Sequence, residues 1–383
     1  MEVKKLKECC TIIAGQSPES KYYNSNGDGL PFFQGKADFG ELYPSIRVYC
    51  SQPTKIAEKD DILLSVRAPV GPTNLAPCKV CIGRGLTAIR PSEVLLTRYV
   101  LLFFRYFEAQ LASKGTGTTF KAITQDVVKN LEIPIPPLPE QERIVARIEE
   151  LFSQLDAGVE TLKKTKAQLA VYRQAVLKEA FEDCIDSVTM GSVATMIDPQ
   201  PSHRTPPEFE NGIPYIGIGD IDYTGKTIRF KDARKVNPAV YEEHLQRYTL
   251  REGDFVMGKI GTIGKPFRLP LPQNYTLSAN VILIQPDAEK INSEYLFWQF
   301  SSPLITEQLM AGKNETSQPA FGIQKARLLR IKMCSPKDQD RIVYSIREKI
   351  SVCENIEQTV TLSLQQAEAM RQSILKDAFE GRL

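Results

Sequence analysis

The chain has little of the chemistry on which most enzymes depend. Among its 383 residues are only two histidines, His203 and His244, and neither stands near a plausible nucleophile, which argues against acyl transfer. Its 48 basic and 46 acidic residues give a net charge of only +2, so no strong basic excess marks it as a nucleic-acid binder. No apolar run approaches the roughly 18 residues that a membrane span needs. The opening Met1–Leu6 turns polar too soon for a signal peptide, so we expect a cytoplasmic protein without membrane contact.

The cysteines do not form a recognisable framework either. There are eight, and they are scattered along the chain, as is typical of free thiols. Cys78 and Cys81 have one metal-like spacing, but a structural zinc site needs a second pair of ligands. We therefore expect no metal site and no catalytic residues.

What the chain does have is an internal repeat. Pro136–Val145 is repeated in Cys334–Val343, with Gln141 and Gln339 at the same point and an offset of 198 residues. The same offset, without a gap, aligns Arg173–Glu182 with Arg371–Glu380. The chain is therefore a duplication.

The segments before these motifs are predicted to be strand-rich and to repeat each other loosely. Short apolar runs bounded by Gly or Pro, such as 30–33, 62–66 and 86–89, are typical of strands, and 98–111 is predicted to be a buried helix. The run 213–217 matches 30–34, and 281–286 matches 86–91. The framework positions match while the loops between them differ. One scaffold thus carries two different surfaces.

Each motif is predicted to start a long amphipathic helix. Prolines set an extended approach to the first helix, which we expect to begin near Glu140. Apolar residues then recur in steps of three and four, which predicts a coiled-coil seam. The predicted seam positions are Ile144, Ile148, Leu151, Leu155, Val159, Leu162, Leu169, Tyr172, Val176 and Ala180, and in the copy Ile342, Ile346, Ile350, Cys353, Ile356, Val360, Leu364, Ala367, Met370, Ile374 and Ala378. The two stripes are expected to pack on each other in antiparallel directions.

These motifs resemble the specificity subunit of type I restriction–modification systems. The resemblance rests on Leu6–Pro18, the loop 115–119, Ile133–Ile144 and the terminal Ile374–Leu383. It implies an α+β fold with two strand-rich target recognition domains, joined by two long helices that form an antiparallel coiled coil with an internal pseudo-two-fold repeat. The expected segments are 1–138 (first recognition domain), 139–182 (central helix), 183–336 (second recognition domain) and 337–383 (C-terminal helix).

The resemblance also implies a function. Each recognition domain would read one half of a bipartite, asymmetric site in double-stranded DNA, and the helices would fix the spacing. The helices would also dock two adenine methyltransferase subunits, and restriction/translocase subunits would join the complex. No cofactor is expected on this chain, because S-adenosylmethionine would bind to the methyltransferase subunits.

Candidate DNA contacts come from the loops that differ between the copies, because Arg and Lys can pair with guanine and Gly/Thr loops can reach phosphates. In the first half they are Gln34, Lys36, Asp38, Arg67, Arg84, Lys114, Thr116, Thr118, Thr119 and Lys121. In the second half they are Asp220, Asp222, Lys259, Lys265, Asn280, Lys313, Asn314, Thr316, Ser317 and Lys325. Candidate contacts to the partner subunits lie at the helix starts: Pro137, Glu140, Gln141, Arg143, Asp338, Gln339 and Arg341.

Two alternative functions are weighed against this one. The run Tyr215–Asp220 resembles the glycine loop of adenosylmethionine enzymes, but its counterpart at Phe32–Lys36 lacks that spacing and no amino-methyltransferase motif accompanies it. The run Pro286–Lys290 imitates a nuclease motif, but its acidic residues are too close together to flank a metal. A non-enzymatic alternative is a coiled-coil scaffold whose two heads bind proteins.

Overall fold

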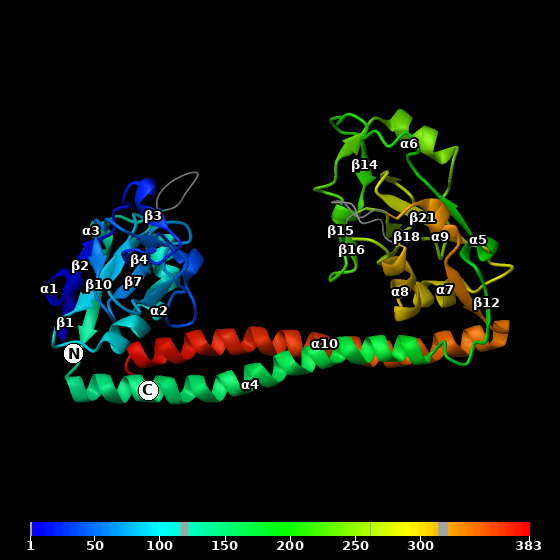
Figure 1. The fold of residues 1–383 in the computed structure, drawn as a ribbon. Coiled ribbons are helices and arrows are strands. Elements are labelled where there is room, and N and C mark those ends of the chain that lie inside the picture. Colours follow the sequence, from blue (N-terminus) through cyan, green and yellow to red (C-terminus); the bar gives the residue numbers. More distant parts are fainter. Residues whose placement is uncertain (1, 116–121, 261, 313–320) are drawn as a thin grey trace. The chain divides into compact units, whose positions relative to one another are not determined.

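The computed structural model describes residues 2–115, 122–260, 262–312 and 321–383 (Figure 1). The chain divides into two compact units. Unit 1 takes in residues 1–163 and 361–383, and unit 2 takes in residues 164–360. Each unit therefore contains one strand-rich part, which we call its head, and a portion of each long helix. The boundaries at 163/164 and 360/361 fall inside the two helices.

The head of unit 1 is built from short strands and one long helix. Its strands are β1 Glu2–Lys5, β2 Cys10–Ala14, β3 Tyr23–Asn24, β4 Leu30–Phe33, β5 Tyr49–Cys50, β6 Ile56–Ala57, β7 Ile62–Ser65, β8 Thr73–Leu75, β9 Val80–Ile82, β10 Leu86–Pro91 and β11 Glu132–Ile135. Its helices are α1 Leu6–Cys9, α2 Thr97–Ser113 and α3 Gln125–Lys129, with 3₁₀ turns η1 Ser20–Tyr22 and η2 Lys36–Asp38.

Three sheets arrange these strands. A four-stranded antiparallel sheet has the order β2-β10-β7-β8, and a five-stranded mixed sheet has the order β3-β5-β4-β9-β6. The pair β1-β11 joins the start and end of the head, with Glu2 opposite Ile135. The head therefore begins and ends at one place, next to the start of the long helix.

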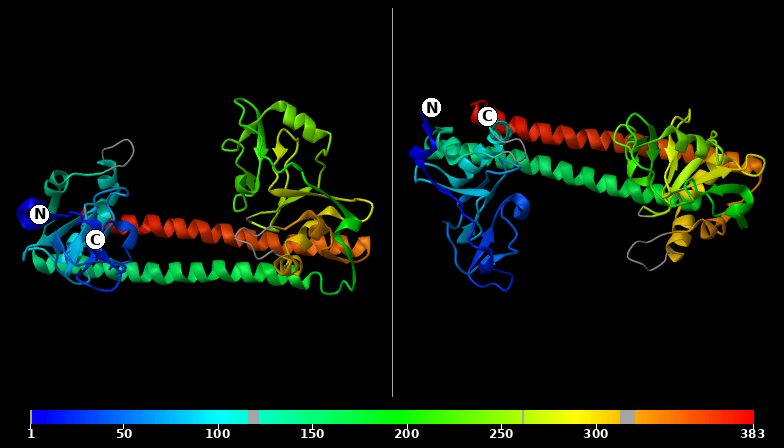
Figure 2. Two further views of the ribbon diagram at one scale, coloured as in Figure 1. Left: turned by 45° about the horizontal axis from the view of Figure 1, so that its top comes forward. Right: turned by 90° about the horizontal axis from the view of Figure 1, so that it is seen from above.

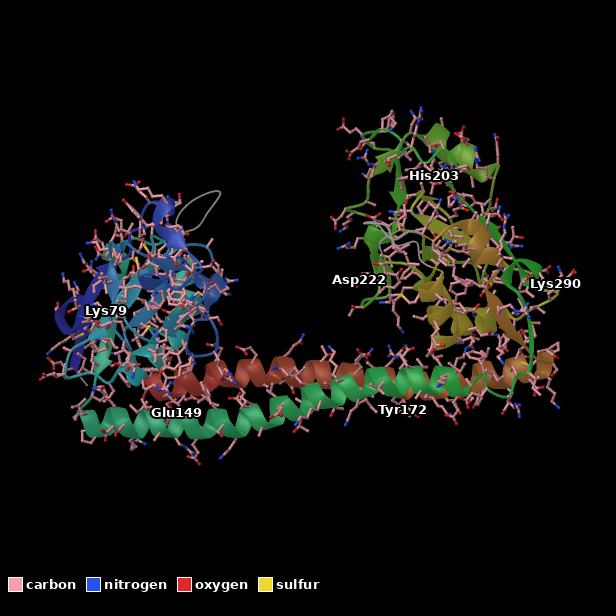
Figure 3. All side chains as sticks on the ribbon, in the orientation of Figure 1. Lys79, Glu149, Tyr172, His203, Asp222 and Lys290 are labelled. Carbon is pink, nitrogen blue, oxygen red and sulfur yellow. The ribbon has the colours of Figure 1, made fainter. Side chains whose placement is uncertain are left out.

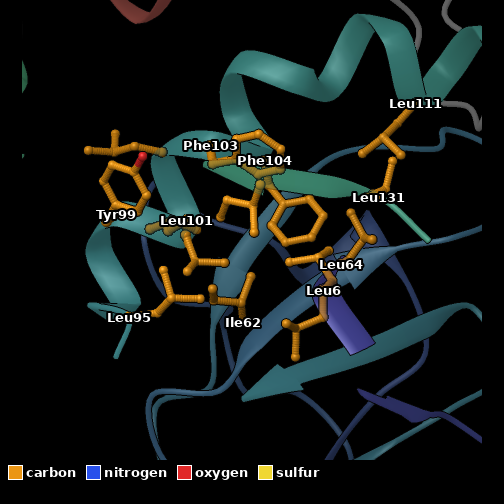
Figure 4. Packing of buried hydrophobic residues seen from close by; sticks show 14 of the residues in the cluster. Leu6, Ile62, Leu64, Leu95, Tyr99, Leu101, Phe103, Phe104, Leu111 and Leu131 are labelled. Carbon is orange, nitrogen blue, oxygen red and sulfur yellow. The ribbon is translucent and has the colours of Figure 1, made fainter. Parts of the chain in front are cut away.

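The core of this head lies between α2 and the four-stranded sheet. Ile62 and Leu64 of β7 are fully buried, and so are Phe104 and Leu111 of α2. Figure 4 shows Phe104 packed beside Leu64 and Leu6. The predicted helix over 98–111 and the predicted strands at 30–33, 62–66 and 86–89 are thus present within a few residues of their expected ends.

The head of unit 2 repeats this plan with different loops. Its strands are β12 Asp186–Thr189, β13 Ala194–Ile197, β14 Ile213–Ile216, β15 Ile221–Asp222, β16 Thr227–Ile228, β17 Lys235–Val236, β18 Phe255–Gly258, β19 Pro266–Arg268, β20 Thr276–Leu277, β21 Val281–Pro286 and β22 Arg330–Met333. Its helices are α5 Met190–Val193, α6 Pro238–Leu245, α7 Ser293–Phe300, α8 Pro303–Ala311 and α9 Ile323–Arg327, with the 3₁₀ turn η3 Ile218–Asp220.

The sheet topology confirms the duplication. The four-stranded sheet β13-β21-β18-β19 has the same order and antiparallel pairing as β2-β10-β7-β8, and β12-β22 corresponds to β1-β11. One difference lies in the helix that covers the sheet. Unit 1 has the single helix α2, whereas unit 2 has α7 and α8, which are separated where Pro303 cannot continue α7.

The long helices are α4, Leu138–Glu179 with 42 residues, and α10, Pro336–Phe379 with 44 residues. Both begin a little earlier than predicted. Pro139 lies in the first turn of α4 rather than before it, because a proline there replaces a backbone N–H that has no helical partner anyway.

Within each unit the portions of α4 and α10 run antiparallel, side by side in all views (Figures 1 and 2). In unit 1, Arg143 of α4 donates to the carbonyl of Leu383 at 3.0 Å, while Arg371 of α10 pairs with Asp156, further along α4. In unit 2, Arg173 pairs with Glu357 at 3.2 Å. Because Arg173 and Arg371 are related by the repeat, the same arginine bridges the helices in both units.

The predicted seam is right at most positions and wrong at three. Ile144, Ile148, Ile346 and Ile350 are buried between helices and heads. In contrast, Tyr172 is 50% exposed, Ile356 40% and Met370 56%. Arg173 and Arg371 follow directly after Tyr172 and Met370 and turn toward the opposite helix instead. Among the residues described, no helix is long and apolar enough to cross a membrane.

A buried carboxylate gives the two heads different electrostatics. Asp61 and Asp254 occupy equivalent positions, because each accepts from the backbone N–H three residues earlier, at Glu58 and Arg251. Asp61 receives two hydrogen bonds from the Arg90 guanidinium, at 2.7 and 2.8 Å. Asp254 receives one from the neutral amide of Gln285, which takes the place of Arg90. Burial raises the pKa of Asp254.

We expect this difference to make unit 2 lose stability with rising pH. A raised folded-state pKa contributes stability below the unfolded value, 3.8, and that stability is lost as pH rises through the folded pKa. Gln285→Arg should therefore stabilise unit 2 at pH 7 by about 1–3 kcal/mol, the worth of hydrogen bonds to a charged group. The gain should shrink at lower pH, where Asp254 is protonated. Urea unfolding followed by the fluorescence of Trp298, the single tryptophan, measures it in unit 2. If Gln285→Arg stabilised unit 2 equally at pH 7 and at the lower pH, this explanation would be contradicted.

Candidate functional site

The hydrogen bonds at the ends of β7 and β18 define which loop residues of the two heads are equivalent. Val66 donates to the carbonyl of Gly85 and accepts from Ile123, both at 3.0 Å. Lys259 makes the same two bonds with Asn280 and Phe321, at 2.8 and 2.9 Å. Val66 therefore corresponds to Lys259, and the next residue in each head, Arg67, corresponds to Ile260.

A tight turn beside this point matches in the same way. Leu86 donates to Gly83 at 2.9 Å and Val281 donates to Ser278 at 3.4 Å, so each turn closes over two central residues. The central residues are Arg84 and Gly85 in unit 1, and Ala279 and Asn280 in unit 2. The scaffold is therefore the same, but the chemistry of its exposed positions differs.

The space available at the turn explains why one head has Gly85 where the other has Asn280. A Cβ on Gly85 would stand 2.2 Å from the carbonyl oxygen of Gln34, so only glycine fits there. Unit 2 has the reverse arrangement, with glycine at Gly217, the counterpart of Gln34, and a side chain at Asn280. A Cβ on Gly217 would stand 3.0 Å from the Asn280 amide. Each head thus keeps one side chain and one glycine at this pair of positions.

In unit 1 the turn borders a cavity of about 320 Å³. Its lining residues are Ala14, Gly15, Val66, Arg67, Arg84, Leu86, Thr87, Ala122, Ile123, Thr124 and Gln125. We call this cavity the arginine notch. Arg67 and Arg84 are both exposed, and no acidic residue is among those that line it. The notch therefore presents two positive charges to solvent.

In unit 2 the equivalent surface is arranged differently. Lys259 is only 14% exposed and pairs with Asp198 at 2.8 Å, and His203 lies 3.9 Å from the same carboxylate. The side chain of Asn280 accepts from the backbone of Ile218 at 3.0 Å and is therefore held within the head. Asp198 and His203 were not among the predicted contacts. No signal in the sequence could have found them, because Asp198 meets Lys259 and His203 only in the folded head.

The other predicted DNA contacts fall into three groups. Lys36 is exposed, Gln34 donates weakly to Ser17 at 3.4 Å, and Lys114 lies over the ring of Phe107. Asp38 pairs with Arg47, Lys265 lies over Tyr223 at 4.2 Å, and Lys325 donates to Gly312 at 3.0 Å. Thr116, Thr118, Thr119, Lys121, Lys313, Asn314, Thr316 and Ser317 lie outside the described residues.

Two predicted acidic contacts serve the backbone instead. Asp220 accepts from the N–H of Gly217 at 2.7 Å. Asp222 accepts from Thr224 and Gly225, and these two backbone N–H groups hold the pKa of Asp222 below its usual value. Both carboxylates stabilise turns, which argues against a role in reading DNA bases.

At the helix starts, the buried glutamines do not fit their predicted partner-binding role. Gln141 is 0% exposed and Gln339 is 2% exposed. The Gln141 amide accepts from Leu96 N–H and donates to the carbonyls of Val94 and Pro136, all at 2.8 Å. Gln339 likewise accepts from Asn292 N–H and donates to Cys334. These side chains fasten each head to its helix and leave no surface for a partner.

Of the charged residues at the helix starts, Arg143 and Arg341 are exposed, and Glu140 and Asp338 are half-buried. Glu140 pairs with Arg143 at 2.8 Å, and Asp338 pairs with Arg341 at 3.0 Å, so the repeat preserves this pair as well. The Arg143 guanidinium holds the pKa of Glu140 below its usual value. Pro137 is also exposed. A partner role for these five residues stays a prediction.

Exposed apolar residues on the helices are a feature that the seam prediction had missed. The exposed fractions are 71% for Val171, 50% for Tyr172, 64% for Tyr344, 57% for Val352, 54% for Leu362 and 56% for Met370. Figure 3 labels Tyr172 on α4. Single exposed apolar side chains are common on protein surfaces, and only where they form a contiguous patch do they mark a surface that binds another protein.

Unit 2 also holds a larger cavity, of about 1120 Å³, beside the break between α7 and α8. Its lining includes Phe297, Trp298, Arg268, Glu294 and Glu354. Arg268 lies over Phe297 at 4.3 Å and pairs with Glu294, so the charges here are largely compensated. Trp298 Nε1, a buried donor, has no hydrogen-bond acceptor among the residues that the structure describes.

Comparison with known proteins gives a consistent result. A family model described as a type I restriction modification DNA specificity domain matches residues 1–170. The putative type I restriction enzyme MjaX specificity subunit of Methanocaldococcus jannaschii is 40% identical over 167 residues, which cover 43% of this chain and 38% of that protein. The chain thus aligns with less than half of that relative. The EcoKI specificity subunit of Escherichia coli K12 is 24% identical, over 80% of this chain and 70% of its own.

Solved structures were compared as well. The HsdS subunit of Thermoanaerobacter tengcongensis is 49% identical over 41% of this chain and 38% of its own, with a TM-score of 0.38. The S subunit of the type I restriction–modification system of M. genitalium is 16% identical over 99% of this chain and 96% of its own, with a TM-score of 0.40.

Proposed function

We propose that the chain is a specificity subunit of a type I restriction–modification system and that it reads DNA sequence for such a complex. In this proposal each head reads one half of a bipartite, asymmetric site in double-stranded DNA. The chain supplies recognition, and the methyl transfer takes place on partner subunits.

One observation carries the proposal. The two heads share sheet order and backbone hydrogen bonds, yet they place Arg67 and Arg84 on one surface and Ile260 and Ala279 on the equivalent one. A duplicated scaffold with two different reading surfaces suits an asymmetric target, because base contacts specify sequence while the scaffold positions them. The near-neutral net charge fits a subunit that shares phosphate contacts with its partners.

The long helices are the proposed spacer and docking surface. Exposed apolar residues on both helices, including Tyr172 and its repeat equivalent Met370, offer a surface for two adenine methyltransferase subunits. The ion pairs Glu140–Arg143 and Asp338–Arg341 would flank it. S-adenosylmethionine would bind to those subunits, and restriction/translocase subunits would complete the assembly.

The experiment is a methylome measurement. The chain is co-expressed with its adenine methyltransferase subunit in a host that lacks other DNA methylation, and methylated positions are read by sequencing. We expect one bipartite, asymmetric motif that disappears when the chain is omitted. A motif that persists without the chain, or the absence of any bipartite motif with it, would refute the proposal.

A further inference from the structure

Arg67 and Arg84 differ from every other arginine of the first head. That head contains six arginines in the sequence, and four of them have a partner: Arg47 with Asp38, Arg90 with Asp61, Arg98 with Glu149, and Arg105 with the carbonyl of Glu41. Within the described part of the chain, the guanidinium groups of Arg67 and Arg84 have none. These are also the two that meet at the arginine notch.

Hydrogen bonds hold the backbone around the notch, from which both side chains project. Arg84 sits at the first central position of a turn closed by the Leu86–Gly83 hydrogen bond, and its own N–H donates to Ser17 Oγ at 3.2 Å. Gly15 brings the neighbouring strand close, since a Cβ there would lie 2.2 Å from the Gly83 carbonyl oxygen. Arg67, two residues after the end of β7, forms an antiparallel bridge with Ala122. The arginines therefore project from hydrogen-bonded backbone rather than from free loops.

An unpaired arginine on a rigid base is well suited to one kind of ligand. The guanidinium forms a planar fork that matches O6 and N7 of guanine in the major groove. In an arginine already paired with a carboxylate, as Arg47 is, this fork is occupied by the carboxylate. Among the described residues that line the notch there is no acidic side chain to reject the electronegative edge of a base. We propose that Arg67 and Arg84 are the guanine-reading residues of the first head, so that its half-site contains at least one G·C pair contacted by this notch.

The second head provides the contrast within the same chain. At the equivalent positions it has Ile260, which is 38% exposed, and Ala279. Apolar side chains contact the methyl group of thymine and cannot make the hydrogen bonds that read guanine. The two half-sites therefore differ in composition at the positions read by this part of the scaffold. This inference rests on the proposed function, because it assumes that the heads read DNA.

The test exchanges the residues of one head for those of the other. The double variant Arg67→Ile and Arg84→Ala places in unit 1 the side chains that unit 2 already carries on the same backbone. The methylome of the complex is measured as for the unchanged chain. We expect the preference for guanine at one or two positions of a single half-site to fall by about 10- to 100-fold, as expected for the loss of bidentate contacts. The other half-site should be read unchanged, which shows that the complex still assembles.

Two further variants separate reading from charge and from folding. Arg84→Lys keeps the positive charge but lacks the fork, and it should also relax one position. Arg47→Ala removes an exposed arginine of the same head that is already paired with Asp38, and it should leave the motif unchanged. If the double variant abolishes methylation altogether, relaxation in Arg84→Lys supports the inference and an unchanged motif overturns it.

The outcomes distinguish the inference from the proposed function. If the unchanged chain yields no bipartite motif, the proposed function fails and this inference fails with it. If it yields a bipartite motif and the double variant retains both half-sites, only the assignment of Arg67 and Arg84 is overturned. The assignment is also overturned if the half-site that the double variant relaxes contains no G·C pair in the motif of the unchanged chain.

Discussion

Replacing Gln141 by leucine is expected to destabilise unit 1 by about 3 kcal/mol or more, a cost that comes from the backbone groups it leaves behind. The Gln141 amide serves Leu96 N–H and the carbonyls of Val94 and Pro136, all at 2.8 Å, at a site with no solvent exposure. Each buried polar group left without a partner costs about 1–3 kcal/mol. Leucine has a similar volume but cannot satisfy any of them.

The equivalent change in the second unit should act in the same way. Gln339 serves the N–H of Asn292 at the start of α7 and the carbonyl of Cys334. Gln339→Leu loses fewer contacts, so we expect a smaller cost, of about 2 kcal/mol or more, from two groups at roughly 1–3 kcal/mol each. Its unfolding transition can be followed through Trp298, which lies in unit 2.

Exposed glutamines on the same helices are the matched controls. Gln154→Leu in α4 and Gln358→Leu in α10 make the same substitution at exposed positions, where the cost should stay within about 0.5 kcal/mol. Calorimetry or urea unfolding of all four variants gives the comparison. If Gln141→Leu were no more costly than Gln154→Leu, the account of the head-to-helix junction would be wrong.

The junction also shows how far the sequence could be read. The repeat offset of 198 residues located both glutamines, but the surrounding charged residues suggested an exposed helix start. Their burial depends on Leu96 and Asn292, which lie about 45 residues away along the chain and only the folded head brings near. The glutamine that both copies retain therefore makes a contact inside each unit, whereas a contact with a partner subunit had been predicted.

The fold was predictable because its signals are local or repeated. Short apolar runs gave the strands, and steps of three and four gave both long helices. Tyr172, Ile356 and Met370 satisfied the same spacing yet lie outside the seam. The spacing of apolar residues alone does not show which stripe of a helix packs on the other helix. Here arginines such as Arg173 take part in the contact between the helices, and a neighbouring apolar stripe stays exposed.

The reading surface was predictable only as a set of residues. Twenty loop positions were candidates, Arg67 among them but not Arg47, although the sequence shows no difference in side-chain chemistry between these two arginines. The fold distinguishes them, because Arg47 forms an ion pair with Asp38, whereas no acidic residue is among the described residues that line the arginine notch. Asp220, Asp222 and Asn280 were likewise indistinguishable from ligands until their backbone hydrogen bonds were known.

A second large effect is expected from lengthening both helices together. The boundaries between the units fall at Lys163/Lys164 in α4 and Val360/Thr361 in α10. Inserting seven residues at each point keeps the heptad period, so the apolar seam stays in phase. Seven helical residues add about 10.5 Å, which corresponds to about three base pairs at 3.4 Å each. Neither insertion touches a head, so base contacts should not change.

The methylome of this paired insertion tests the central claim, that two separate heads on a fixed spacer read the two halves of one site. The account predicts the same two half-sites with a gap longer by one to about three base pairs, the smaller values arising because the heads must also follow the turn of the groove, about 10.5 base pairs per turn. A gap that stays the same, or half-sites whose bases change, would contradict it.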